Sequence, residues 1–498
     1  MSAASRFGPA LAALVVCASA CGRGGGSIGP GVLVIAVDGL RADHLSAYGY
    51  DRDTSPNLSA LAAEGIRFEH VFASAPQLIP AHVALLTGCE PLLARRFLLP
   101  EMEGPIERRW LVPARGLHLA VEFLAAGYAT AAFLDHEHIG EAQGFAQGFQ
   151  TYRVLELGKK QAWEGGQSAR VMEHFLQWLR ALPPGRPWFA YLHLNQLERC
   201  WSEPTAYSAG TYPARPTLAE VPPVGSTDSV FFAVPRSRWR GGPRTLGQYE
   251  AVYDDAIHAL DGEFERLFAS LRRLARFDAT ALHVLGSYGM QMGEAGLYLS
   301  AGRYSQADLG VPWIFRPRAA PAGVRGRAIP GLVSTLDVAP TLLELEGLAV
   351  PRAMSGRSQA AVARDPRARA VKRRMVFASC GLQSGFAAIG EQYVLEHLVP
   401  EGTGDARLRR SWFGERTKFK RHLGLSFYAR ERLAHPPLEA EILSAPRAKA
   451  SAFQDEAFRW RDDTNEARRF LQASRWRSTL DRATREHLRE RGYVEASR

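Results

Sequence analysis

Short apolar runs alternate with amphipathic stretches through most of the chain. Residues 31–37 are continuously apolar, which is typical of a parallel strand buried on both faces. Residues 168–182 place Val171, Phe175 and Leu179 on one stripe and therefore predict a helix. The other predicted elements are helices over residues 56–63, 80–86, 117–126 and 249–274, and strands over residues 129–134, 188–194, 279–285 and 311–315. This alternation predicts an α/β fold with a large, mostly parallel central sheet sandwiched by helices.

Polar residues that follow the predicted strands are the candidate site residues, because ligands in such folds bind beyond the carboxyl ends of the strands. Asp38 directly follows the first strand. His136 and His138 follow another strand, and Glu198 lies just beyond a third. Adjacent histidines and carboxylates resemble a transition-metal site, but a run of polar residues after a strand is also typical of a solvated loop.

The N-terminus carries the pattern of an export signal. Residues 10–16 form an apolar run that is too short to span a bilayer, and the small residues Ala18 and Ala20 fit a signal-peptidase site. Residues 1–20 are therefore predicted to be a signal peptide. Cys21, directly after the predicted cleavage point, fits a bacterial lipoprotein whose thiol is acylated.

Residues 21–30 are rich in glycine and predict a flexible tether between this anchor and the folded protein. We expect the chain to be exported to the bacterial cell envelope, as a periplasmic or outer-membrane lipoprotein attached to the membrane by its N-terminal lipid. Secretion without a lipid is the alternative.

Composition and charge divide the remainder of the chain. The hydrophobic fraction of 46% is ordinary for a protein that buries a core, and the formal net charge is +10. Basic residues become denser near residue 365, so we predict an α/β domain over residues 31–365 and a basic C-terminal subdomain over residues 366–498. Charges of both signs alternate in that tail and no nucleic-acid motif accompanies them, so no nucleic-acid binding is expected.

Several ordered segments resemble the sulfatase family, part of the alkaline phosphatase superfamily. They are residues 34–45 (VIAVDGLRADHL), 54–58 (TSPNL), 63–68 (AEGIRF), 80–88 (PAHVALLTG), 127–131 (GYATA), 144–149 (GFAQGF), 253–257 (YDDAI), 336–343 (LDVAPTLL) and 492–495 (GYVE). The resemblance implies the fold predicted above, with a smaller C-terminal subdomain. It also implies hydrolysis of sulfate or phosphate esters by a nucleophile at a helix N-terminus, assisted by a divalent cation that is commonly calcium.

The resemblance places most of the catalytic positions on residues that cannot perform the chemistry. The first metal carboxylate falls on Asp38, which is present, but the nucleophile position falls on Leu78, which has no attacking heteroatom. The later metal pair falls on Ser287 and Tyr288, which are weak calcium ligands. The sequence therefore predicts a degenerate site in which Asp38 is a lone remnant of the metal centre.

Some polar residues fit remnants of the family's site. His82 lies near the start of the nucleophile helix, where relatives place Arg or His, although a capping histidine fits equally well. His138 resembles part of a motif that grips the ester oxygens, and His136 and Glu198 are the other predicted substrate-binding residues.

Three hypotheses follow. The first is an inactive, surface-tethered sulfatase-like protein that needs no cofactor and binds a sulfated or phosphorylated ligand or a protein partner. The second is a metal-dependent ester hydrolase with a rearranged site, which would require Ca²⁺ or another divalent cation. The third is a structural lipoprotein of the envelope.

Overall fold

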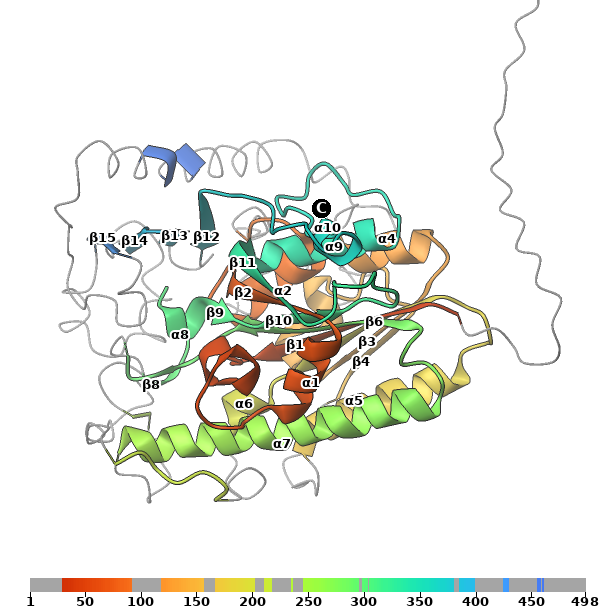
Figure 1. Cartoon of the computed structure of the whole chain (residues 1–498), viewed down its shortest axis with the longest axis horizontal. Coiled ribbons are helices and arrows are strands. Elements are labelled where there is room, and N and C mark those ends of the chain that lie inside the picture. The colour runs from red at the N-terminus through yellow and green to blue at the C-terminus, as the bar shows by residue number, and fades with distance from the viewer. Residues whose placement is uncertain are drawn as a thin grey trace, which may run out of the picture.

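Helices cover both faces of a central nine-stranded sheet in the computed structural model of the chain (Figure 1). The structure describes residues 29–91, 118–155, 166–201, 210–216, 234–235, 245–294, 298–302, 304–379, 385–398, 424–429, 455–457 and 459–460. The predicted signal peptide, Cys21, nearly all of the tether and most of the basic tail lie outside these ranges. Among the described residues, no helix combines the length and apolar character needed to cross a bilayer.

The strands of the central sheet run in the order β11-β2-β10-β6-β1-β5-β3-β4, and β9 pairs with β2. They are β1 (Gly31–Asp38), β2 (Ile66–Phe72), β3 (Ala129–Leu134), β4 (Thr151–Val154), β5 (Trp188–Leu194), β6 (Thr280–Tyr288), β9 (Gly310–Val311), β10 (Trp313–Arg316) and β11 (Arg327–Ser334). Two small sheets are formed by β7 (Gln291–Met292) with β8 (Tyr298–Ser300), and by β12 (Met375–Ser379), β13 (Phe386–Gly390), β14 (Tyr393–Leu398) and β15 (Gly424–Ala429). Within the main sheet, β1 runs parallel to β5 and β6, whereas β10 runs antiparallel to both of its neighbours.

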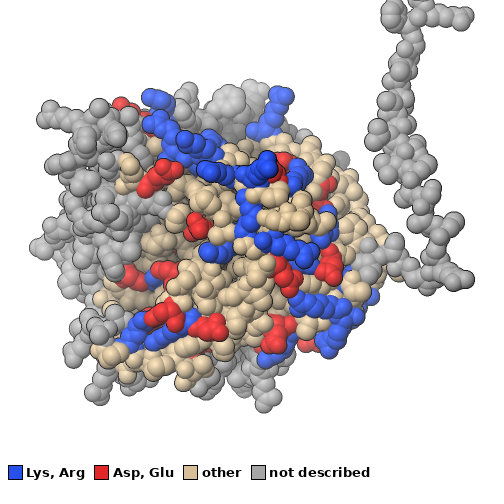
Figure 2. Space-filling model, in the orientation of Figure 1, with Lys and Arg blue, Asp and Glu red and all other residues tan. Residues whose placement is uncertain are grey.

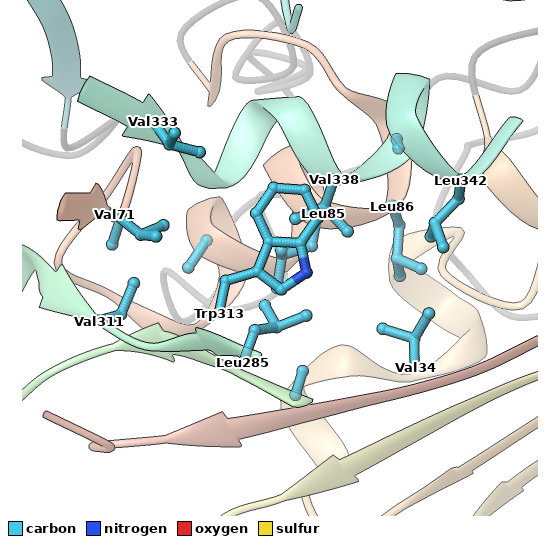
Figure 3. Close-up of a cluster of buried hydrophobic side chains, with 14 of the residues drawn as sticks. Val34, Val71, Leu85, Leu86, Leu285, Val311, Trp313, Val333, Val338 and Leu342 are labelled. Carbon is cyan, nitrogen blue, oxygen red and sulfur yellow. The ribbon is translucent and has the colours of Figure 1, made fainter. Parts of the chain in front are cut away.

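Strand β1 lies at the centre because every one of its residues is apolar up to Asp38. Successive side chains of a strand point to opposite faces, so Val32, Val34 and Ala36 join one apolar cluster while the residues between them join the other. Figure 3 shows the first cluster, in which Val34 and Trp313 from the sheet lie beneath helical side chains such as that of Leu85. The same alternation directs Asp38 to the face that carries this first cluster.

Each face of the sheet has its own layer of helices (Figure 1). The helices are α1 (Pro56–Glu64), α2 (Leu78–Thr87), α4 (Leu119–Ala125), α5 (Gly166–Ala181), α6 (Gln196–Arg199), α7 (Leu246–Arg273), α8 (Gln306–Leu309), α9 (Val338–Leu345) and α10 (Ala361–Arg364). Helices α1, α5 and α7 lie on one face, and α2, α4 and α9 lie on the other. The helix that carries Leu78 therefore lies on the face to which Asp38 points.

The predicted α/β fold with a large, mostly parallel sheet is confirmed. Strands β3 and β5 have the predicted bounds, and the predicted strand over residues 311–315 is divided into β9 and β10. Pro312, which has no backbone N–H to donate, separates β9 from β10 there. The proposed division at residue 365 stays a prediction, although the antiparallel sheet of β12–β15 lies on its C-terminal side.

Candidate functional site

The candidate site is centred on Asp38, at the carboxyl end of β1. The neighbouring parallel strands carry His193 on β5 and Ser287 on β6 to the same level of the sheet. His82 on α2 approaches from the face to which Asp38 points. The side chains of all four residues have no solvent exposure.

The carboxylate of Asp38 is held by three side chains. Its Oδ1 lies 3.0 Å from Nε2 of His82, and its Oδ2 lies 2.7 Å from Nε2 of His193. The hydroxyl of Ser287 donates a further hydrogen bond to Oδ1. Asp38 is therefore enclosed by two imidazoles and a hydroxyl, and the prediction of a lone Asp38 missed both imidazoles as its partners.

Further polar groups lie close to the Nδ1 atoms of the two imidazoles, whose Nε2 atoms face Asp38. Nδ1 of His82 lies 2.6 Å from the hydroxyl of Tyr191, and Nδ1 of His193 lies 3.2 Å from Oδ1 of Asp135. The other oxygen of Asp135 accepts a hydrogen bond of 2.8 Å from the backbone N–H of Asn195. Tyr191 thus holds the second nitrogen of His82, and the Asp135 carboxylate lies close to the second nitrogen of His193.

Burial and neighbouring charges set the protonation of this cluster. Burial alone would raise the pKa of Asp38, but His193 and His82 hold that pKa well below its usual range. Burial opposes the charged form of His193, yet the adjacent Asp38 raises the pKa of His193 to about 10. Burial lowers the pKa of His82. In the metal-free protein at neutral pH, Asp38 and His193 are therefore an ion pair and His82 is neutral.

The predicted nucleophile position offers no reactive group. Leu78 is the first residue of α2, where the helix dipole would favour an anion, but its half-buried side chain packs against the apolar core. Gly39 directly follows Asp38, and its φ of 72° lies in the left-handed region. A Cβ atom there would lie 2.9 Å from Cε of Met290, the flexible end of that side chain.

The other predicted site residues are only partly brought together. Tyr288 packs in the apolar cluster on the α2 face, whereas Ser287 reaches Asp38. His136 lies beside the cluster, with its ring centroid 6.4 Å from that of His193 and 4.6 Å from that of His138. Burial, with the charge of His193, lowers the pKa of His136 to about 3.

Glu198, on α6, lies next to Gly39 and so near the same edge of the sheet. No substrate-binding role is tested by this placement, and His136, His138 and Glu198 stay predictions.

Sequence reasoning missed His193 and Tyr191. Both occur in the otherwise apolar run of β5, and their spacing of two residues places them on one face of the sheet. A polar ring inside a continuous apolar strand was the available signal, because such a group must find a partner when it is buried. Asp135, which directly follows β3, is also part of the cluster, because it is buried against His193.

The residues present do not fit calcium, the cation that the resemblance implies. Calcium takes about 6–8 oxygen ligands. Around Asp38 the described structure supplies one carboxylate, two imidazoles and one hydroxyl. No step of a calcium-assisted reaction is therefore assigned to this site.

A model of the sulfatase family matches residues 30–348 of the chain. The chain belongs to the sulfatase family. Over 101 residues it is 38% identical to arylsulfatase A of Bos taurus, and this match covers 20% of the chain and 19% of the bovine protein. The chain thus spans only about a fifth of the length of this mammalian sulfatase.

Longer similarities extend over most of the fold. The chain is 20% identical over 382 residues to an arylsulfatase of Clostridium perfringens, covering 66% of the chain and 77% of that sulfatase. The phosphonate monoester hydrolase of Agrobacterium radiobacter superposes with a TM-score of 0.64 at 18% identity, covering 88% of the chain and 96% of the hydrolase. These similarities establish the sulfatase fold and leave the activity to be argued from the site.

Proposed function

We propose that this member of the sulfatase family is a non-catalytic binding protein of the bacterial envelope. The observation that supports this proposal is the combination of Leu78 at the start of α2 with an Asp38 carboxylate enclosed by His82, His193 and Ser287. The family's reaction requires an attacking heteroatom beside a cation that stabilises the ester's anionic oxygens. Leucine supplies no such atom, and the donor set around Asp38 does not suit calcium.

An anionic ligand is the ligand class that the surface favours. Exposed cationic side chains are concentrated over residues 352–374, where Asp365 is the single acidic residue. They are Arg352, Arg357, Arg364, Arg367, Arg369, Lys372 and Arg374. In Figure 2, Lys and Arg side chains are concentrated on the part of the visible surface where α9 and α10 lie in Figure 1.

Few of these cations are neutralised by neighbours. Arg364 pairs with Glu344, and Arg374 pairs with Glu456. Within the described part of the chain, Arg367, Arg369 and Lys372 have no ion pair with an acidic side chain. A surface of this sign attracts sulfated or phosphorylated polymers through long-range electrostatics.

The proposed location follows from the N-terminal sequence. Acylation of Cys21 would hold the domain close to the envelope membrane through the glycine-rich tether. Replacing Cys21 with Ser should then release the protein from the detergent phase to the aqueous phase in a partition assay. Equal partition of both forms would contradict the lipid anchor.

Binding and turnover are measured on the same purified protein. We expect no hydrolysis of nitrophenyl sulfate or nitrophenyl phosphate, and salt-sensitive binding to a sulfated dextran but not to neutral dextran. Reversing charge at Arg367, Arg369 and Lys372 together should weaken this binding. Reversal at Arg273, which is exposed on α7 at the other layer of the sheet, is the single-site control, and it should be compared with reversal at Arg369 alone.

Each alternative function predicts a different outcome. Ester turnover that is abolished by Asp38→Ala would favour a hydrolase with a rearranged site. Absence of both turnover and polyanion binding would favour a structural envelope lipoprotein.

A further inference from the structure

The imidazoles of His82 and His193 are arranged as metal ligands usually are. Each ring directs Nε2 toward Asp38 and places Nδ1 against an oxygen of a further side chain. Histidines that ligate metals almost always direct the second ring nitrogen to a carboxylate, carbonyl or water, which fixes the tautomer and the ring plane. Asp135 occupies this outer position for His193, and the Tyr191 hydroxyl occupies it for His82.

We infer that Asp38, His82 and His193 form a binding site for one divalent transition-metal ion, with zinc as the best match. One ligand atom from each residue lies within 4.8 Å of the others. Two imidazoles with one carboxylate form a ligand set that zinc and iron(II) accept readily and that calcium does not. This set uses two histidines outside the carboxylate-rich calcium pattern that the resemblance implied.

The distances allow an ion after a small outward movement. The contacts of 3.0 Å and 2.7 Å between Asp38 and the two Nε2 atoms are hydrogen-bond distances. Ligand atoms around a tetrahedral zinc ion lie about 3.4 Å apart, given metal–ligand bonds of about 2.0–2.1 Å. A rise of a few tenths of an ångström in each contact would accommodate the ion.

The charges of the buried side chains also favour a bound divalent ion. Asp38 and Asp135 are two buried carboxylates that flank the two imidazoles. One divalent ion with both imidazoles neutral would balance the two negative charges, and buried charges are costly unless they are compensated. Arg199 is the other described cation at this point, and it contacts the backbone oxygen of Asp135.

The site is closed, which suits a structural rather than a catalytic ion. Asp38, His82, His193 and Ser287 all have no solvent exposure, and the Ser287 hydroxyl occupies a further side of the carboxylate. Structural zinc is almost always four-coordinate, so Asp38, His82 and His193 would need a fourth ligand, and the buried Ser287 hydroxyl beside Asp38 is a candidate for it. A bound ion would therefore tie α2 to strands β1 and β5 without restoring ester hydrolysis.

The test measures metal binding by the full-length protein after removal of metals with a chelator. We expect uptake of one Zn²⁺ per chain, a rise in the melting temperature, and a visible ligand-field spectrum when Co²⁺ replaces zinc. His82→Gln and His193→Gln should abolish the Co²⁺ spectrum, and Ca²⁺ in excess should not displace Zn²⁺.

Outer and control variants separate a metal site from a purely structural cluster. Tyr191→Phe keeps the ring but removes the hydroxyl at His82, and should weaken Zn²⁺ binding about 10- to 100-fold. His70→Gln, at an exposed position on β2, should leave binding unchanged. If the wild-type protein binds no Zn²⁺ and its melting temperature does not change when Zn²⁺ is added, the inference is overturned and the cluster is an ion pair without metal.

Binding that persists in both ligand variants would also overturn the inference. These outcomes are independent of the proposed function, because metal uptake and ester turnover are read separately.

Discussion

His283 makes the fold sensitive to acid, and the size of the effect can be worked out from its surroundings. The ring is fully buried on β6, stacked on Phe315 with centroids 4.4 Å apart. Its Nδ1 faces Nε1 of Trp313 at 3.4 Å, and its Nε2 has no hydrogen-bond partner in the described structure. Burial, with the charge of Arg318, lowers the pKa of His283 to about 3 from its ordinary value of 6.5.

The sign follows from linkage between protonation and folding. Below pH 6.5 the unfolded chain binds a proton at His283 that the folded chain rejects until about pH 3, so the free energy of unfolding falls as the pH is lowered through this window. Each pH unit costs about 1.4 kcal/mol for one such group. Between pH 7.5 and pH 5.0, His283 alone should therefore remove about 2 kcal/mol of stability.

His283→Phe tests this reasoning, because phenylalanine keeps the stack on Phe315 but cannot titrate. Urea unfolding at pH 7.5 and pH 5.0 gives the loss of stability on acidification for each protein. The variant should lose about 2 kcal/mol less than the wild type, whatever constant penalty the lost Trp313 contact adds. His70→Gln is the control at an exposed site. An equal loss in wild type and His283→Phe would refute a buried, neutral His283.

Three further predictions concern the site and the core. Asp38→Ala should lower the free energy of unfolding by about 3–5 kcal/mol, because it breaks a buried ion pair and leaves His193 with the more distant carboxylate of Asp135; a change below about 1 kcal/mol in chemical denaturation would contradict the ion pair. Leu78→Ser places a hydroxyl at the start of α2, yet turnover of nitrophenyl sulfate should stay at background, and measurable turnover would show that only the nucleophile had been lost. Trp313→Ala should cost about 3–5 kcal/mol, since this ring is fully buried in the cluster of Figure 3, whereas Val350→Ala at an exposed position should change stability by less than about 0.5 kcal/mol.

The sequence pattern was sufficient for the elements that are periodic and bounded by strong signals. Continuous apolar runs located β1, β3 and β5, since a strand buried on both faces leaves little room for polar residues. Strand β2 was not predicted, because its run IRFEHVF mixes exposed and buried positions. The antiparallel direction of β10 could not be predicted from local pattern, because strand direction depends on partners far away in the chain.

For the site, the sequence by itself predicts that a nucleophile is missing. Leucine at position 78 cannot attack an ester in any fold, and this conclusion needs only the family motif and the chemistry of the side chain. The N-terminal export pattern is likewise a property of local sequence, and it stays a prediction because those residues lie outside the described structure.

Only the tertiary structure decided what surrounds Asp38. His82 and His193 are separated from Asp38 by 44 and 155 positions in the sequence. The residues around each histidine do not indicate which side chain it will contact. The parallel pairing of β1 with β5, and the packing of α2 over that face, bring the three side chains together. Hydrogen bonds and ion pairs form between groups that are close in space, and closeness across a sheet is set by strand order and register, which no single segment of the chain encodes.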